Sequence, residues 1–294
     1  MGSDNLGRVA GGLTGDANQI DVYQAGHDHS AGIFGLNGQS NNVTINQSGD
    51  NHTAEIVSLN GSNNTFRINQ SDYDNMFYVW PVTGDNNTVI VNQSGESHLS
   101  IPNALVGNDN SISLEQTGSS NDARFRVDGD NNRIGMRNLG TNSDMHVSVE
   151  GDLNRVSTTQ YHGNNKEVTV DLMGDGNIIT ATQWHEGARL NISTGGQQAD
   201  SNVVETWQEG RFNSIDLLLT GYANTVDIHQ EGQGSNSVSG LSGVGGFEVG
   251  GNRSSLTIDQ LGANNTVQGM QLSDSSSINV MQSGSYNTAV IQQF

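Results

Sequence analysis

A short pattern recurs along nearly the whole chain, and its period limits what the chain can fold into. One position holds Gln in eleven repeats and Asn in one, and most steps between repeats are 22 or 23 residues. Six positions earlier stands an Asn in ten repeats and a Ser in the last two. A fixed period of this size indicates a stack of similar units and not an ordinary globular core.

The two recurring positions define two columns in the expected stack. The first column consists of Gln24, Gln47, Gln70, Gln93, Gln116, Asn138, Gln160, Gln183, Gln208, Gln230, Gln260 and Gln282. The second column consists of Asn18, Asn41, Asn64, Asn87, Asn110, Asn132, Asn154, Asn177, Asn202, Asn224, Ser254 and Ser276. Two steps are longer than the rest, from Gln183 to Gln208 and from Gln230 to Gln260.

Apolar and polar residues alternate between the two columns. Ile20 and Val22 precede Gln24, and the other repeats follow the same rule. Alternation with a period of two places such residues on one face of a β-strand. A second alternating run follows, as at Phe125 and Val127, and Gly residues suited to tight turns separate the runs. One repeat therefore predicts a strand, a turn, a second strand and a second turn.

These units predict an all-β fold, a β-solenoid of about twelve two-strand coils with cross-β stacking. It would cover residues 18–294, after an N-terminal segment of residues 1–17. Stacking places Gln over Gln and Asn over Asn, so that each amide can donate to one neighbour and accept from the other. A buried Gln is costly unless it is fully hydrogen-bonded. The Gln and Asn residues of both columns are therefore predicted to form a self-assembly ladder.

Composition narrows the possible partners. The chain has 31 acidic and 11 basic residues and a net charge of −20, which disfavours nucleic-acid binding. It has no Cys, which excludes disulfides and thiol chemistry. No apolar run is long enough to span a membrane, so membrane insertion is not expected.

The last repeat carries a motif that consists of Ser276, Gln282, Gly284, Asn287, Ala289 and Gln293. This motif resembles the curlin repeat of bacterial curli fibre subunits. The fifth repeat is close to this motif, with Asn110, Gln116, Gly118, Asn121 and Ala123. The eleventh repeat is similar, with Ser254, Gln260, Gly262, Asn265 and Gln271. The resemblance covers residues 18–294, although the chain has twelve repeats where the familiar subunit has five.

The resemblance implies a secreted, extracellular structural protein that polymerises head to tail into amyloid fibres. Such fibres support the biofilm matrix and adhesion at the cell surface. The implied partners are further copies of the chain, a nucleator subunit and an outer-membrane secretion pore. A monomeric β-solenoid that acts as an adhesin or presents a ligand is the alternative. An ice-binding face is disfavoured, because the outward positions hold Asp21, Thr44 and Arg67 in turn and not a Thr ladder.

Three places interrupt the pattern. Residues 240–251 read GLSGVGGFEVGG and predict a flexible loop that bulges from one turn. A binding loop with an exposed Phe247 is the alternative there. Pro81 and Pro102 fall in the second runs of neighbouring repeats and predict a local kink or bulge, because proline lacks a ladder donor.

Two sets of residues carry candidate metal chemistry. An Asp follows the turn Gly in several repeats, as Asp16, Asp85, Asp130, Asp152 and Asp175. Such a column either binds calcium or simply suits the turn. Three histidines, His29, His52 and His98, lie at the Asn position of the other turn. Together with His27 they either hold a transition metal or form no site. No nucleophile elbow, phosphate loop or paired-His zinc helix occurs, so neither an enzyme nor a cofactor is expected.

Overall fold

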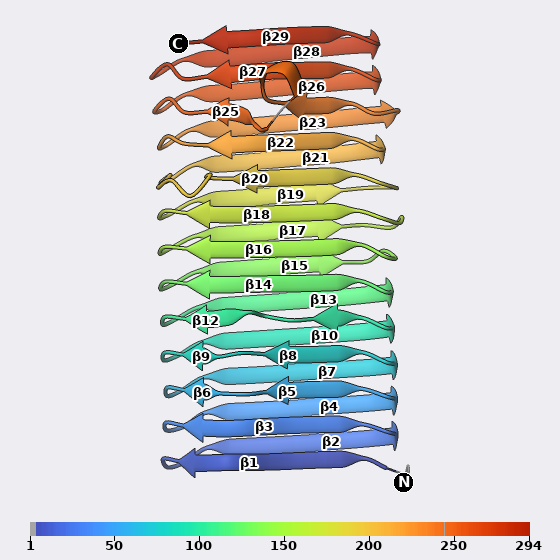
Figure 1. Ribbon diagram of the computed structural model, residues 1–294, viewed down its shortest axis with the longest axis vertical. Helices are drawn as coiled ribbons and strands as arrows, with labels where there is room; N and C mark the ends of the chain where they lie inside the picture. The colour runs from blue at the N-terminus through green and yellow to red at the C-terminus, as the bar shows by residue number, and fades with distance from the viewer. Residues whose placement is uncertain (1–3, 244) are drawn as a thin grey trace. The chain divides into compact units, whose positions relative to one another are not determined.

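The protein is described by a computed structural model that covers residues 4–243 and 245–294. It divides into two compact units, Met1–Ser143 and Asp144–Phe294. Each unit is a β-solenoid of six turns built from parallel strands, as Figure 1 shows within each unit. One short 3-10 helix, η1 (Leu241–Gly243), is the sole helical element in the described part of the chain. The predicted all-β solenoid of about twelve coils is confirmed.

Two sheets face each other in the first unit. The strands that end near the Gln column form the glutamine sheet: β2 (Gln19–His27), β4 (Asn42–Asp50), β7 (Thr65–Tyr73), β10 (Thr88–Glu96), β13 (Ser111–Ser119) and β15 (Arg133–Asn138). The strands that run back form the return sheet: β1 (Leu6–Thr14), β3 (Ser30–Asn37), β5 (Thr53–Ile56), β6 (Leu59–Asn60), β8 (Met76–Val79), β9 (Val82–Thr83), β11 (Leu99–Ser100), β12 (Ala104–Val106) and β14 (Asp122–Asp128).

The second unit repeats this arrangement. Its glutamine sheet contains β17 (Arg155–Gln160), β19 (Ile178–Gln183), β21 (Val203–Arg211), β23 (Thr225–Gln233), β26 (Ser255–Ala263) and β28 (Ser277–Ser285). Its return sheet contains β16 (Asp144–Glu150), β18 (Glu167–Met173), β20 (Arg189–Ser193), β22 (Ser214–Leu219), β24 (Ser237–Ser239), β25 (Phe247–Val249), β27 (Thr266–Gln271) and β29 (Thr288–Gln293).

Neighbouring coils pair in register. In the first unit Gln24 lies opposite Gln47, and Gln47 lies opposite Gln70. The inward residues Val43 and Ile45 of β4 are fully buried, so the alternating apolar positions form the core between the two sheets. Because a slip by one residue would turn these side chains to solvent, the buried face fixes the register.

The turn before each position of the Asn column is built around a residue in the left-handed conformation. Ala17 and Ser40 have φ of 59° and 57° before Asn18 and Asn41. Glycine is required where neighbouring turns touch. A Cβ built on Gly26, whose φ is 125°, would lie 1.7 Å from the carbonyl oxygen of Gly49. The Gly residues of the sequence pattern therefore permit the close stacking of successive turns.

Both prolines lie where return strands are interrupted. Pro81 lies between β8 and β9, and Pro102 lies between β11 and β12. The strand pair β5 and β6 is interrupted in the same way at residues 57–58, where no proline occurs.

The prediction for residues 240–251 is wrong in its placement. The extra residues interrupt a return strand and do not extend a turn, since β24 ends at Ser239 and β25 resumes at Phe247. Val238 pairs with Ile215, and Phe247 pairs with Leu217. Phe247 is fully buried, so the alternative of an exposed binding side chain is also wrong.

Residues 6–14 of the N-terminal segment form β1, which pairs with β3 in the return sheet. The segment therefore adds a strand before the first glutamine-sheet strand. In the described residues no helix is long and apolar enough to cross a membrane.

Candidate functional site: amide ladders and edge strands

The Gln column forms a chain of side-chain hydrogen bonds that all point the same way. In the first unit each Nε2 donates to the Oε1 of the next coil over 2.9 Å, from Gln24 through Gln47, Gln70 and Gln93 to Gln116. In the second unit the same bonds measure 2.8–3.0 Å and connect Gln160, Gln183, Gln208, Gln230, Gln260 and Gln282. Each Nε2 also donates to a return-strand carbonyl, as Gln47 does to Ser30. The buried amides are thus bonded to their neighbours, except that Gln160 Oε1, at the start of the ladder of the second unit, has no partner among the described residues.

Asn138 departs from the predicted ladder. It lies opposite Gln116, but its side chain is shorter by one methylene. Its Nδ2 donates to the Ser143 carbonyl and its Oδ1 accepts from the Gly140 N–H. The Nε2 of Gln116 donates instead to the carbonyls of Leu99 and Asn121. The amide-to-amide ladder of the first unit therefore ends at Gln116, and the inclusion of Asn138 is corrected.

The Asn column ties each turn to the next one. Asn41 Nδ2 donates to the Gly61 carbonyl over 2.8 Å, and Asn41 Oδ1 accepts from the Asn64 N–H over 2.9 Å. Asn177 repeats both bonds in the second unit, with Ala199 and Asn202. Ser254 makes the same two kinds of bond with its shorter side chain, because its hydroxyl donates to the Ser273 carbonyl and accepts from the Ser276 N–H.

A further column lies in the other turn, and sequence reasoning did not recognise it as a ladder. It includes His29, His52, Asn75, His98 and Asn121, which are all buried. Asn75 Nδ2 donates to the Ser71 carbonyl, and its Oδ1 accepts from the His98 N–H. The recurrence of Asn and His at one offset was the available signal.

The histidines of this column act as substitutes for asparagine. His52 Nε2 lies 3.0 Å from the Ser48 carbonyl, and its Nδ1 lies 3.2 Å from the Asn75 N–H. One ring nitrogen therefore faces an acceptor and the other a donor, which places the proton of the neutral ring on Nε2. The His29 and His52 rings stack in parallel at 5.1 Å. Both ring nitrogens of His52 are thus engaged by the backbone, which is a structural use and not metal ligation.

Burial lowers the pKa of His52 and His98 below 6.5, because desolvation disfavours the charged ring. The hydrogen bonds to the Ser48 and Ser94 carbonyls and the charge of Asp72 act in the opposite direction but are smaller. In the second unit Lys166 holds the corresponding position of its turn, and burial lowers its pKa to about 8. Its Nζ donates to the Gly163 carbonyl over 3.2 Å.

The Asp column caps backbone donors. Asp85 Oδ1 accepts from the Ser62 N–H over 2.7 Å, and Asp175 Oδ1 accepts from the Asp152 N–H over 2.8 Å. Ser62 Oγ accepts from the Gln39 N–H in the same way, although a Ser replaces the Asp at this position. Among the described residues no group of three or more His, Asp or Glu side chains is suited to a metal ion.

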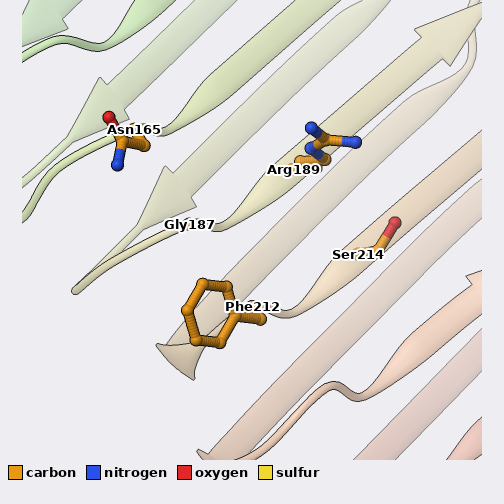
Figure 2. Close-up of a pocket in the computed structure, with 5 residues that line it drawn as sticks. All are labelled: Asn165, Gly187, Arg189, Phe212 and Ser214. Atoms are coloured by element: carbon orange, nitrogen blue, oxygen red, sulfur yellow. The ribbon is translucent and has the colours of Figure 1, made fainter.

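The second unit also carries an aromatic row and a surface pocket. Tyr161 stacks on Trp184 at 3.9 Å, and Trp184 lies 5.9 Å from Trp207. A pocket of about 410 Å³ is lined by Asn165, Gly187, Arg189, Phe212 and Ser214 (Figure 2). None of these five lining residues is a carboxylate, thiol or imidazole, so the pocket holds no acid–base pair.

The two edge strands of the glutamine sheets, β2 and β28, present complementary hydrogen-bonding groups. Among the described strands β2 pairs with β4 alone, and β28 pairs with β26 alone. In the ladder Nε2 always points toward the next coil, so the last rung presents a donor at Gln282 and the first an acceptor at Gln24. The Ser255 N–H donates to the Ser276 carbonyl in the next coil. Because N–H direction alternates along a strand, the N–H groups of Ser277, Asn279 and Met281 face the unpaired edge of β28.

Comparison with known proteins agrees with this repeat architecture. The family described as curlin associated repeat matches the chain at residues 15–49, 38–71 and 107–137. A comparison with curated proteins gives no significant match.

Proposed function

Because three segments of this chain match the curlin associated repeat, we propose that it is the self-assembling subunit of an extracellular, curli-like amyloid fibre. The observation that carries the proposal is the common direction of the amide ladder, which leaves a donor at one edge and an acceptor at the other. An unblocked sheet edge recruits further strands. The fold and the repeat are structural in character, and the proposed activity is assembly rather than catalysis.

The junction between two copies would continue the stacking found inside each unit. β28 of one copy would pair with β2 of the next, so that Gln282 Nε2 donates to Gln24 Oε1 and Ser276 Oγ accepts from the Asn18 N–H. The edges differ, so the contact is head to tail and does not close on itself. Such a contact produces filaments and not rings.

The remaining parts of the proposal rest on the family. Curli-like fibres lie outside the cell and support biofilm matrix and adhesion. We extend to this chain the partners of that system, namely further copies of itself, a nucleator subunit and an outer-membrane secretion pore.

Met281→Pro tests the proposal at the edge. The Met281 side chain is 71% exposed and its N–H faces the unpaired edge, where proline is tolerated by the folded chain. The substitution removes a donor that only a second copy would use. Seeded growth followed by electron microscopy should slow at least tenfold relative to Met281→Ala, which keeps the N–H.

Wild-type fibres should also give a meridional reflection near 4.7–4.8 Å, the spacing of stacked strands. A wild-type protein that stays monomeric at high concentration would contradict the proposal and support the monomeric adhesin. Equal growth of the two Met281 variants would show that fibres grow through another surface.

A further inference from the structure

β1 holds a place in the return sheet that a second copy would need. The Asn5 side chain precedes β1, accepts from the His29 N–H over 3.1 Å and donates to the Gly26 carbonyl over 3.0 Å. Asn265 makes the same two bonds near the last coil, to the Asn287 N–H and the Gly284 carbonyl. Asn5 therefore occupies a regular rung of the second-turn column.

The order of strands creates a conflict at the proposed junction. In every coil a glutamine-sheet strand comes first and a return strand follows. If β2 of the next copy pairs with β28, then β3 of that copy must pair with β29. The edge of β3 is already covered by β1. If β1 stays and pairs with β29 instead, no strand fills the glutamine sheet between β28 and β2.

β1 is a less regular strand than β29. Its register with β3 shifts between Ala10 and Leu13, whereas β29 pairs with β27 without interruption from Thr288 to Gln293. Val9 is 46% exposed, although Ile33 beneath it is fully buried.

At two equivalent positions, the inward-facing side chains of β29 are larger than those of β1. When Asn5 is aligned with Asn287, Gly7 corresponds to Ala289 and Val9 corresponds to Ile291. β29 of a second copy would therefore bring a methyl group where β1 brings none, without a bulge. Exchange of one strand for the other keeps the column bonds and adds apolar side chain opposite Ala31 and Ile33, while the pairing of Leu13 with Leu36 is released.

We propose that β1 is a displaceable strand that covers the edge of β3 in the unassembled chain, and that β29 of a second copy replaces it when the fibre grows. This inference rests on the proposed function of self-assembly. It identifies β29 of a second copy as the partner of the β3 edge in the fibre, and it makes strand exchange a step of assembly.

A reversible crosslink tests the exchange. Leu6 and Ser30 are opposite partners in β1 and β3, and the chain has no Cys. Neighbouring in-register strands lie about 4.8 Å apart, which suits a disulfide. A protein with Leu6→Cys and Ser30→Cys holds β1 in place when oxidised and releases it when reduced. On wild-type seeds the oxidised form should elongate at least tenfold more slowly than the reduced form, and dithiothreitol should restore growth.

A second crosslink is the matched control. Ser237 and Thr266 are opposite partners at the start of two interior return strands, β24 and β27. Oxidation of Ser237→Cys with Thr266→Cys should leave elongation unchanged. Equal growth of the oxidised and reduced Leu6 and Ser30 pair overturns strand exchange while leaving self-assembly intact. Absence of growth in both the wild type and the reduced pair overturns the proposed function, and the inference fails with it.

Discussion

Single amides in this chain depend on neighbouring coils for their hydrogen bonds. Gln70 accepts from Gln47 and donates to Gln93, and its Nε2 also reaches the carbonyls of Thr53 and Asn75. The side chain is only 2% exposed, so water cannot replace these partners. Loss of one rung therefore leaves donors and acceptors unsatisfied in the coils on both sides.

Gln70→Ala should lower the free energy of unfolding by about 1–3 kcal/mol, the cost of leaving buried polar groups without partners. Chemical denaturation of the soluble protein measures the change. Gln39→Ala is the control, because the Gln39 side chain is exposed in a neighbouring turn. Equal stability of the two variants would contradict a buried ladder whose hydrogen bonds stabilise the fold.

The buried histidines predict sensitivity to acid. Protonation of His52 would place an Nδ1–H against the Asn75 N–H, two donors that face each other. Because the folded-state pKa values of His52 and His98 lie below 6.5, the unfolded chain binds more protons near and below that pH. The two neutral histidines therefore stabilise the folded state fully above pH 6.5, and this stabilisation is lost as the pH falls through and below that value. Denaturation midpoints measured from pH 7.5 to 5 should fall accordingly.

The double variant His52→Asn with His98→Asn should flatten this pH dependence. Asn75 and Asn121 already fill the same column, and both donate to a carbonyl four residues earlier as the histidines do. The asparagine variant has no group there that titrates in this range. An unchanged slope in the variant would assign the acid sensitivity to other groups.

At the scale of the element, the split return strand of β24 and β25 can be made continuous. Residues 240–246 separate Ser239 from Phe247, while the strands on both sides keep consecutive partners. Deletion of residues 240–246 should keep the β-rich circular dichroism spectrum and leave Tm equal or slightly higher, because a shorter connection costs less entropy.

Deletion of residues 240–247 is the matched control. It removes one residue more, shifts the strand by one position and turns Glu248 toward the core. This protein should unfold at a clearly lower temperature. Similar Tm values for the two deletions would contradict the register of β25 with β22.

The strands were predictable from sequence where local pattern and stacking agree. One short run indicates both the inward face and the ladder position, as Ile20, Val22 and Gln24 do. β1 gave no such signal, because Gly7 and the Gly11–Gly12 pair replace the inward side chains that reveal the other strands. The direction of the His52 ring and the acceptor role of Asp85 depend on contacts with another coil. A single repeat does not contain that information.

At the scale of the whole molecule, charge should control the rate of association. A net charge of −20 makes copies repel one another at low ionic strength. Raising the salt concentration from about 10 mM to about 150 mM shortens the screening length from about 30 Å to about 8 Å. Elongation on seeds, followed by light scattering, should accelerate. A rate that stays constant or falls, with an unchanged Tm, would contradict a role for this repulsion.

The in-register pairing of coils also bears on how such a chain evolves. Asn41 contacts the turn that holds Asn64, and Asn64 contacts the turn that holds Asn87, through the same atoms. A genetic duplication or loss of one whole step joins surfaces that already fit, and the first and last strands stay as they were. A change of one or two residues within a strand turns its side chains over or breaks its pairing. The fold therefore tolerates a change in the number of repeats more readily than a change in the spacing within one repeat.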